Sequence, residues 1–201
     1  LDGHTGAVRA MASWPAIDPV LRGDQPNEAK TNRALNARME LGSIYKPLTV
    51  AAALDANVLQ PWDTFDTSKP VKVGAVTVRD PHPLKNAASA TAQDILAESS
   101  NVGSALIAQR LGPEKQKAFL GKVGLLGGQK TDGPQLASPL LPERWDATAM
   151  ATIAYGHGLS VSPMAFAAAF TPFANGGMHV PPSFVEPVDE VKATRVMSAE
   201  M

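Results

Sequence analysis

The sequence predicts an α/β chain of the α+β type, in which a mainly helical subdomain follows the first strand or strands of a sheet. Two observations predict this class. Alanine- and leucine-rich stretches with helix-start and helix-stop residues fill the middle of the chain, while strand-like segments are short and lie near its ends or in one central hairpin. The 201 residues amount to one domain or slightly more.

The first forty residues are predicted to hold the first strand or strands and a connector. A turn over residues 2–6 precedes a strand from Ala7 to Ala12, and residues 14–39 are polar and contain several prolines, which predicts an irregular segment. We therefore divide the chain into three predicted parts: residues 1–40, a helical subdomain at 41–175, and residues 176–201, which lead into further strands.

The helices of the central part are predicted from their caps and breakers. Thr91 and Asp94 form a capping-box pattern that opens one helix, and Ser162 followed by Pro163 is a cap with a first-turn proline that opens another. The predicted elements are helices at residues 43–56, 91–98, 102–111, from 113 onward, 147–154 and 163–174, a hairpin of residues 71–73 and 76–78, and a loop at 124–144.

Composition excludes several kinds of site. The net charge of −1 gives no indication of nucleic-acid binding, and the absence of cysteine excludes disulfides, thiolate metal sites and a cysteine nucleophile. No apolar run approaches the ~18 residues that span a bilayer, and there is no signal-peptide or lipidation pattern. The four histidines are His4, His82, His157 and His179, and their spacing is not that of metal ligands. We therefore expect neither a metal nor a cofactor.

The segment from Gly42 to Pro47 pairs a serine with a lysine three residues later. Positions i and i+3 share one face of a helix, so the side chains of Ser43 and Lys46 can meet if a helix begins at about Ser43. Pro47 is tolerated only near a helix start, which places Ser43 at the N-terminus with Gly42 just outside. The partial positive charge there favours an oxyanion and a neutral Lys46 that can accept the Ser43 proton.

A second motif, Ser99-Ser100-Asn101, follows about fifty residues later and is predicted to lie in a loop. Ser-x-x-Lys alone is common by chance, and the alternative reading is a solvated helix turn. The glycine before it, the proline after it, the alanine-rich helix that follows and a Ser-x-Asn element in the right order favour a nucleophile with its base.

With these motifs the chain resembles the transpeptidase domain of class B penicillin-binding proteins. The resemblance implies the serine transferase fold shared with β-lactamases, here as a helical subdomain plus an incomplete antiparallel sheet. Within the family, the Ser-Ser-Asn-Val-Gly and Gly-x-Gly-Leu-x-Val-x-Pro stretches resemble the division-specific, septal type. The residues that carry the resemblance span nearly the whole chain: Thr5-Gly6, residues 10–13, residues 32–34, residues 42–47, residues 99–103 and residues 156–163.

The resemblance implies a D,D-transpeptidase that cross-links peptidoglycan stem peptides through an acyl-enzyme and is covalently inhibited by β-lactam antibiotics. By the same resemblance Ser43 is the nucleophile and Lys46 the acylation base. Ser99 relays a proton to the leaving D-alanine, and Asn101 hydrogen-bonds the substrate amide and the Lys46 side chain. Substrate-binding roles are carried over to Gly42, Ser100, His157 and Gly158.

One family element, Lys-Thr/Ser-Gly on a strand, has no match. The tripeptides at 130–132 and 30–32 begin Lys-Thr but end in Asp132 and Asn32, and we read both as chance matches in loops. We therefore expect a fragment, truncated at both ends and impaired alone. The resemblance implies a periplasmic domain whose full-length protein is anchored in the cytoplasmic membrane by one N-terminal helix. Its implied partners are a membrane glycosyltransferase and other divisome proteins.

Two other functions on the same scaffold stay open. One is hydrolysis, by a D,D-carboxypeptidase or a serine β-lactamase. The other is a non-catalytic penicillin-binding sensor or scaffold. Against a β-lactamase, no glutamate is evidently placed to activate a deacylating water, and class D enzymes lack the asparagine that Asn101 provides. The intact set of Ser43, Lys46, Ser99 and Asn101 argues against a decayed site.

Overall fold

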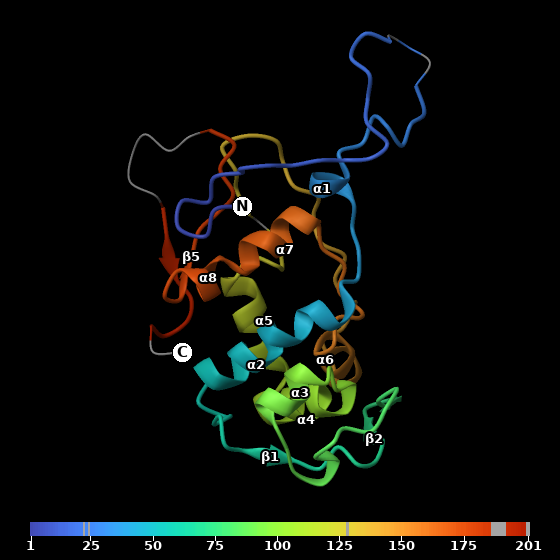
Figure 1. The fold of residues 1–201 in the computed structure, drawn as a ribbon, viewed down its shortest axis with the longest axis vertical. Coiled ribbons are helices and arrows are strands. Elements are labelled where there is room, and N and C mark those ends of the chain that lie inside the picture. The colour runs from blue at the N-terminus through green and yellow to red at the C-terminus, as the bar shows by residue number, and fades with distance from the viewer. Residues whose placement is uncertain (22, 24, 128, 186–191, 200–201) are drawn as a thin grey trace. The chain divides into compact units, whose positions relative to one another are not determined.

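The structure, a computed structural model, describes residues 1–21, 23, 25–127, 129–185 and 192–199 (Figure 1). These residues form two compact units, each assembled from separate stretches of chain. Unit 1 comprises residues 1–39, 122–140 and 161–199, and unit 2 comprises residues 40–121 and 141–160. None of the described helices is long and apolar enough to cross a membrane. Described ladders of two or more residue pairs are all antiparallel and occur beside several helices, which confirms the α+β class.

Unit 2 is a helical cluster arranged around one helix. The helix α4 packs against α2, α3 and α6, and Figure 1 shows α3 and α4 side by side. The helical elements of unit 2 are η1 (Gly42–Tyr45), α2 (Lys46–Asp55), η2 (Ala87–Ser89), α3 (Ala92–Ala97), α4 (Asn101–Leu111), α5 (Pro113–Lys122) and α6 (Ala147–Ile153). The last residue of α5, Lys122, is counted with unit 1.

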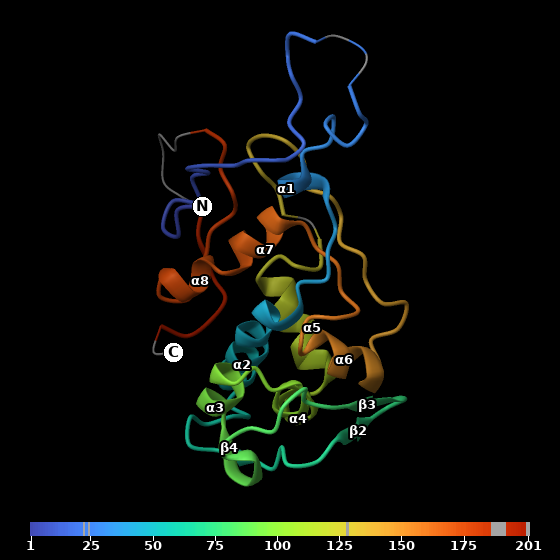
Figure 2. The ribbon, with the colours of Figure 1, turned by 45° about the vertical axis from the view of Figure 1, so that its right-hand side comes forward.

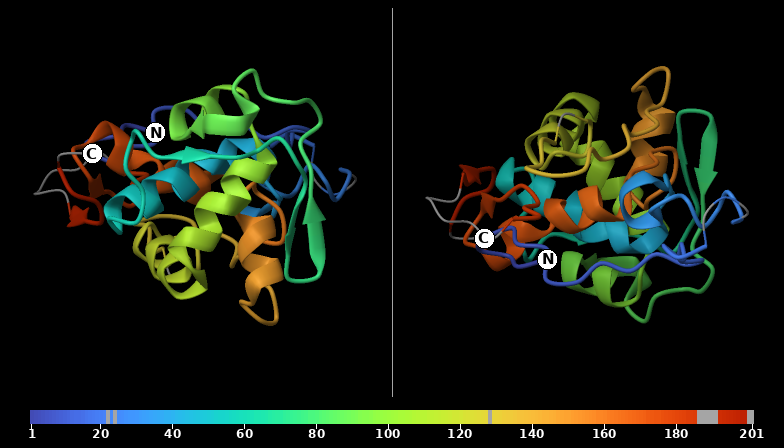
Figure 3. Two further views of the ribbon diagram at one scale, coloured as in Figure 1. Left: turned by 90° about the horizontal axis from the view of Figure 1, so that it is seen from below. Right: turned by 90° about the horizontal axis from the view of Figure 1, so that it is seen from above.

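Two short antiparallel strand pairs complete unit 2. The predicted hairpin is confirmed: β2 (Val71–Val73) pairs with β3 (Val76–Val78), and Figure 3 shows it beside α6. A further antiparallel pair, β1 (Thr64–Phe65) with β4 (Ala90–Thr91), was not predicted because two residues are too few to show an alternating pattern.

The core of unit 2 is apolar and closely packed. The predicted capping box is confirmed, since the Thr91 hydroxyl accepts from the Asp94 backbone N–H and the Asp94 carboxylate accepts from the Thr91 backbone N–H. It starts α3, which buries Ile95 completely. Ile107 of α4 is also completely buried and belongs to the same apolar cluster, which includes Phe65.

Unit 1 contains shorter elements, and Figure 2 shows α7 followed by α8. Ser162 caps α7 as predicted, because its Oγ accepts from the Ala165 N–H at 3.2 Å. The predicted single helix to residue 174 is wrong: it breaks at Phe170, since Pro172 has no N–H with which to continue the helical ladder. The elements are α1 (Arg33–Asn36), α7 (Pro163–Ala169), α8 (Thr171–Ala174), β5 (Met178–His179) and β6 (Thr194–Arg195).

The predicted strand over residues 7–12 is also wrong. Ala7 forms a single bridge with Ser183, around which the Val8 N–H donates to the Ser183 carbonyl at 2.9 Å. Within the described part of the chain, the backbone of residues 9–12 finds no ladder partner, and a strand does not form without one. Residues 186–191 and 200–201 of the predicted C-terminal lead-in lie outside the described residues.

The core position of Ile107 gives a test of this packing. Ile107→Ala removes a fully buried side chain from α4 and should lower the free energy of unfolding by about 2–5 kcal/mol. Gln109→Ala, on the exposed side of the same helix, is the matched control and should change it by no more than about 0.5 kcal/mol. Urea unfolding measures both, and equal midpoints for the two variants would contradict the packing.

Candidate active site

Ser43 lies in the first turn of a continuous helical segment formed by η1 and α2. This turn is a 3-10 helix, in which the Lys46 backbone N–H donates to the Ser43 carbonyl. That bond satisfies the carbonyl to which Pro47 cannot donate, so the proline is accommodated at the second position of α2. The predicted helix start is confirmed, except that Gly42 is the first residue of the turn and does not lie outside it.

The loop after α6 fastens the Ser43 end of this segment. The Gly42 N–H donates to the Gly156 carbonyl at 3.1 Å, and the Gly158 N–H donates to the Glu40 carboxylate at 2.7 Å. Gly156 has a φ of +90°, and a Cβ on it would lie 2.0 Å from the Gly42 carbonyl oxygen. Only glycine permits this approach. His157, between the two glycines, is exposed.

Lys46 is a buried cation in unit 2, with 1% of its surface exposed. Its Nζ donates to the Ser99 hydroxyl at 2.8 Å and to the Ser99 carbonyl. Burial lowers the pKa of Lys46 from 10.5 to about 8, and the negative charge of Asp80 opposes this fall. The lowered pKa of Lys46 increases the fraction of molecules that hold a neutral Lys46 near neutral pH, the form that can accept a proton.

Ser99 makes these contacts from an uncommon backbone conformation. Its φ is +57°, in the left-handed region that costs energy for a residue with a Cβ. In this conformation both the carbonyl and the hydroxyl of Ser99 reach the same ammonium group of Lys46. The turn between α3 and α4 is thus shaped to hold the lysine.

Ser100 and Asn101 begin α4. Ser100, 1% exposed, is its N-cap: its Oγ accepts from the Gly103 N–H at 2.8 Å and donates to Asp80 at 2.7 Å. Asn101 is the first helical residue, so its predicted loop position is wrong; the adjacent cap residue starts the helix one residue earlier than expected. The Asn101 Nδ2 donates to the Arg79 carbonyl at 3.3 Å.

Asp80 is a residue that sequence reasoning missed. Its Oδ1 accepts from the backbone N–H groups of Asn101 at 2.5 Å and Val102 at 3.0 Å, beside the Oδ2 bond from Ser100. The only signal in the sequence is an aspartate soon after a predicted strand, which does not identify a partner twenty residues away.

The predicted catalytic side chains are therefore joined in part. Lys46 and Ser99 are in direct contact, and Asn101 is linked to their turn through Asp80 rather than bonded to Lys46. Among the described residues, the Ser43 hydroxyl makes no hydrogen bond, and Ser43 is connected to Lys46 through the backbone of one turn. Its exposed side chain is open to an incoming molecule.

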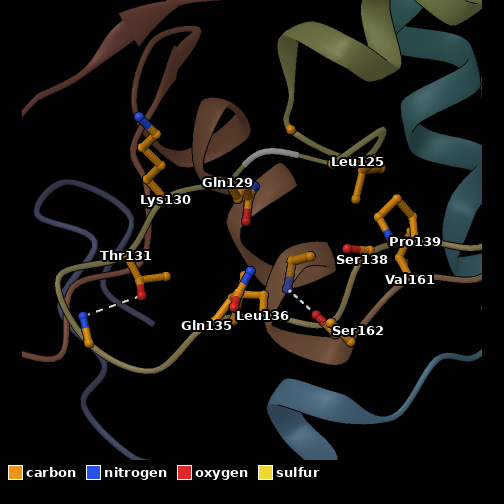
Figure 4. Close-up of a pocket in the computed structure, with 15 residues that line it drawn as sticks. Leu125, Gln129, Lys130, Thr131, Gln135, Leu136, Ser138, Pro139, Val161 and Ser162 are labelled. Carbon is orange, nitrogen blue, oxygen red and sulfur yellow. Dashed lines mark hydrogen bonds between the residues drawn. The ribbon is translucent and has the colours of Figure 1, made fainter.

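Unit 1 contains a hollow of about 430 Å³, which includes none of these residues (Figure 4). Gln129, Leu136 and Ser162 are among its walls, and the figure shows the cap bond of Ser162 at its edge. Thr131 also lines this hollow. It belongs to the Lys130-Thr131-Asp132 tripeptide, which lies in a loop and not on a strand. No group of three or more His, Asp or Glu side chains within the described residues could hold a metal ion.

Comparisons with known proteins place this geometry in a family. A family model described as the penicillin binding protein transpeptidase domain matches residues 1–201. The chain is 36% identical over 174 residues to a probable peptidoglycan D,D-transpeptidase FtsI from Caulobacter vibrioides, covering 87% of this chain and 29% of that protein. It is 33% identical over 201 residues to a probable peptidoglycan D,D-transpeptidase PenA from Neisseria flavescens, covering 99% of this chain and 49% of that protein.

A solved structure of a penicillin-binding protein is similar to this chain in fold. The transpeptidase domain of penicillin-binding protein 3 from Burkholderia pseudomallei, in its apo form, aligns with a TM-score of 0.82 at 27% identity, over 100% of this chain and 56% of that one. The chain thus spans less than half the length of the two curated relatives. On the match of the family model along its whole length, the chain belongs to the family of penicillin-binding protein transpeptidase domains.

Proposed function

We propose that this chain carries the nucleophile and the base of a peptidoglycan D,D-transpeptidase that acts in septal cell-wall synthesis and is inhibited covalently by β-lactams. The observation that supports it most is the buried Lys46, whose pKa is lowered to about 8, one helical turn after the exposed Ser43. The names of the curated relatives, both probable D,D-transpeptidases, support the reaction class.

In the proposed acylation, the Ser43 oxygen attacks the carbonyl carbon of the penultimate D-alanine and its proton passes to neutral Lys46. The peptide bond to the terminal D-alanine then breaks, and the leaving amine takes a proton through the Ser99 hydroxyl, which already contacts Lys46 at 2.8 Å. The amine of a second stem peptide attacks the resulting ester, forms the cross-link and releases Ser43. A β-lactam ring carbonyl replaces the first substrate and leaves a lasting ester.

The start of the helical segment supplies electrostatic stabilisation in this proposal. The Ser43 N–H belongs to the first turn, whose N–H groups lack partners within the helix, so it can donate to the oxyanion. The hydrogen bond from the Gly42 N–H to the Gly156 carbonyl holds that turn against the loop after α6. We assign Gly42, His157 and Gly158 to the wall of the substrate site on this basis.

Asn101 is assigned to the substrate amide. Its Nδ2 is engaged by the Arg79 carbonyl, while within the described residues its Oδ1 accepts no hydrogen bond and is available to a substrate N–H. Ser100, buried with both hydroxyl functions in use, we assign to holding the motif rather than to contacting the substrate.

Partners and location follow from the same proposal. Peptidoglycan is assembled outside the cytoplasmic membrane, so the domain acts on the extracytoplasmic side. We propose that the full-length protein is anchored by an N-terminal helix and works with a membrane glycosyltransferase and other division proteins. The relative named FtsI supports the division type.

Ser43→Ala should abolish covalent labelling by a fluorescent penicillin, and Lys46→Ala should lose nearly as much. Because the two groups act as one unit, the double variant should be hardly worse than either single variant. Ser89→Ala and Lys115→Ala, at exposed positions elsewhere in unit 2, are the controls and should label normally. Labelling of the Ser43→Ala protein at the wild-type rate would refute the nucleophile. The lifetime of the adduct separates a long-lived transpeptidase ester from the rapid turnover of a β-lactamase.

The pKa of Lys46 predicts how acylation depends on pH. Below about 8 the amine is mostly protonated and cannot accept the Ser43 proton, so the rate should rise with pH and level off above about 8. Between pH 6 and 7 the increase should approach about tenfold. Second-order acylation rates measured across this range check it; a rate that is flat or falls between pH 6 and 8 would exclude neutral Lys46 as the base.

Asn101→Ala should impair acylation more than stability. The N-cap of α4 is Ser100, so loss of the Asn101 amide should slow acylation at least about tenfold, the value of one hydrogen bond to a bound substrate, with little change in melting temperature. Ser100→Ala provides the contrast in stability: removal of the cap should cost ~1 kcal/mol of stability, which the loss of the Asn101 amide should not. A normal acylation rate with a lowered melting temperature in Asn101→Ala would make it a structural residue.

A further inference from the structure

The N-terminus of α4 is hydrogen-bonded to a single carboxylate, that of Asp80. Asp80 accepts three hydrogen bonds from the first residues of this helix region: from the Ser100 hydroxyl at 2.7 Å, the Asn101 N–H at 2.5 Å and the Val102 N–H at 3.0 Å. The carbonyl of the preceding residue, Arg79, accepts from the Asn101 amide. Residues 79–80 therefore bind the Ser100 side chain and both the backbone and the side chain of Asn101, the last two residues of the Ser99-Ser100-Asn101 motif.

Asp80 is itself held by the β2–β3 hairpin. Val78, two residues before it, is 3% exposed and lies in the same apolar cluster as residues of α4 and α6. The hairpin turn is fixed to α6, because the Ala75 N–H donates to the Thr148 hydroxyl at 2.9 Å. A Cβ on Gly74 would lie 2.3 Å from that hydroxyl. The carboxylate thus lies two residues beyond the end of β3, in a segment that this packed hairpin anchors.

The negative charge of Asp80 also affects the pKa of Lys46. Among the described residues Asp80 is the charged group whose field shifts the pKa of Lys46, and it raises that pKa against the larger effect of burial. Other titratable groups also lie on or next to the elements packed around α2. Asp94 bonds Thr91, and Arg110 pairs with Asp63 at 2.6 Å. The remaining groups are the buried Tyr45 on η1, Asp55 at the far end of α2, the exposed Glu98 after α3, and Tyr155, with the exposed His157, after α6.

We propose that Asp80 is a positioning residue for acylation: its hydrogen bonds hold the Ser99-Ser100-Asn101 motif against Lys46, and its negative charge acts on this buried lysine through that motif. The inference rests on the proposed function, since it gives Asp80 a part in the same reaction. Asp80 touches no reacting atom and acts through Lys46, Ser100 and Asn101.

The two parts of this role have separate consequences. The hydrogen bonds fix where Ser99 and Asn101 stand, so their loss lowers the maximal acylation rate. The charge makes Lys46 a stronger base at the cost of a smaller neutral fraction at neutral pH, so its loss moves the pH midpoint of acylation to lower pH. A residue with only a structural role would change stability and the maximal rate but would leave the midpoint where it is.

The test compares pH profiles of penicillin acylation for the wild type, Asp80→Asn and Asp80→Ala, at a temperature where each is folded by circular dichroism. Asp80→Asn keeps an acceptor for the two backbone N–H groups but removes the charge. It should shift the midpoint below that of the wild type, which the pKa of Lys46 leads us to expect near 8, with a modest loss of maximal rate. Asp80→Ala should show the same shift and a maximal rate lower by on the order of tenfold to a hundredfold. Asp66→Asn, an exposed carboxylate that bonds Ser68, is the control and should match the wild type.

A midpoint in Asp80→Asn equal to that of the wild type would overturn the charge role, and a wild-type maximal rate in Asp80→Ala would overturn the positioning role. If neither variant folds, Ser100→Ala, which removes one hydrogen bond to Asp80 but keeps its charge, should lower the maximal rate and leave the midpoint unchanged; a wild-type rate there would overturn the inference. A wild-type protein that does not label at Ser43 would show instead that the proposed function is wrong.

Discussion

A lysine that is buried and still able to lose its proton is the constraint on which unit 2 depends. Removing Lys46 from water disfavours its charge, and the structure compensates with two acceptors from Ser99 and one negative charge, Asp80. Too little compensation would exclude the lysine from the core, while a full ion pair would hold its proton through the physiological range. A pKa of about 8 lies between these limits.

Several backbone features that local propensity disfavours occur around this lysine. Ser99 is left-handed without being glycine, Pro47 lies inside a helix, and Gly156 approaches another backbone more closely than any other residue would allow. Each is stabilised by a contact made elsewhere in unit 2, such as the Gly42–Gly156 hydrogen bond. Such conformations persist only where the surrounding structure over-determines them, and they gather where geometry matters for chemistry.

The parts of the fold that could be predicted from the sequence are those that depend on neighbours in the chain. The Thr91–Asp94 box, the Ser162 cap and the β2–β3 hairpin each complete their hydrogen bonds within a few residues. The errors had non-local or competing causes: the strand at residues 7–12 lacks a partner along its length, and the helix after Ser162 breaks because Pro172 cannot donate. Asp80 could not be found because its partners lie twenty residues away and no local pattern connects them.

The same distinction explains the middle residue of the Ser-Ser-Asn motif. The two outer residues face the proposed chemistry, whereas Ser100 is buried and must both accept the Gly103 N–H and donate to Asp80. A hydroxyl can do both at once, but a carboxylate at this position would face Asp80 as a like charge, and alanine would leave the Gly103 N–H and one Asp80 oxygen without this partner. The motif therefore joins two kinds of requirement in three residues. Its ends are set by reactivity, and its centre is set by the need to fix a helix start against a distant carboxylate.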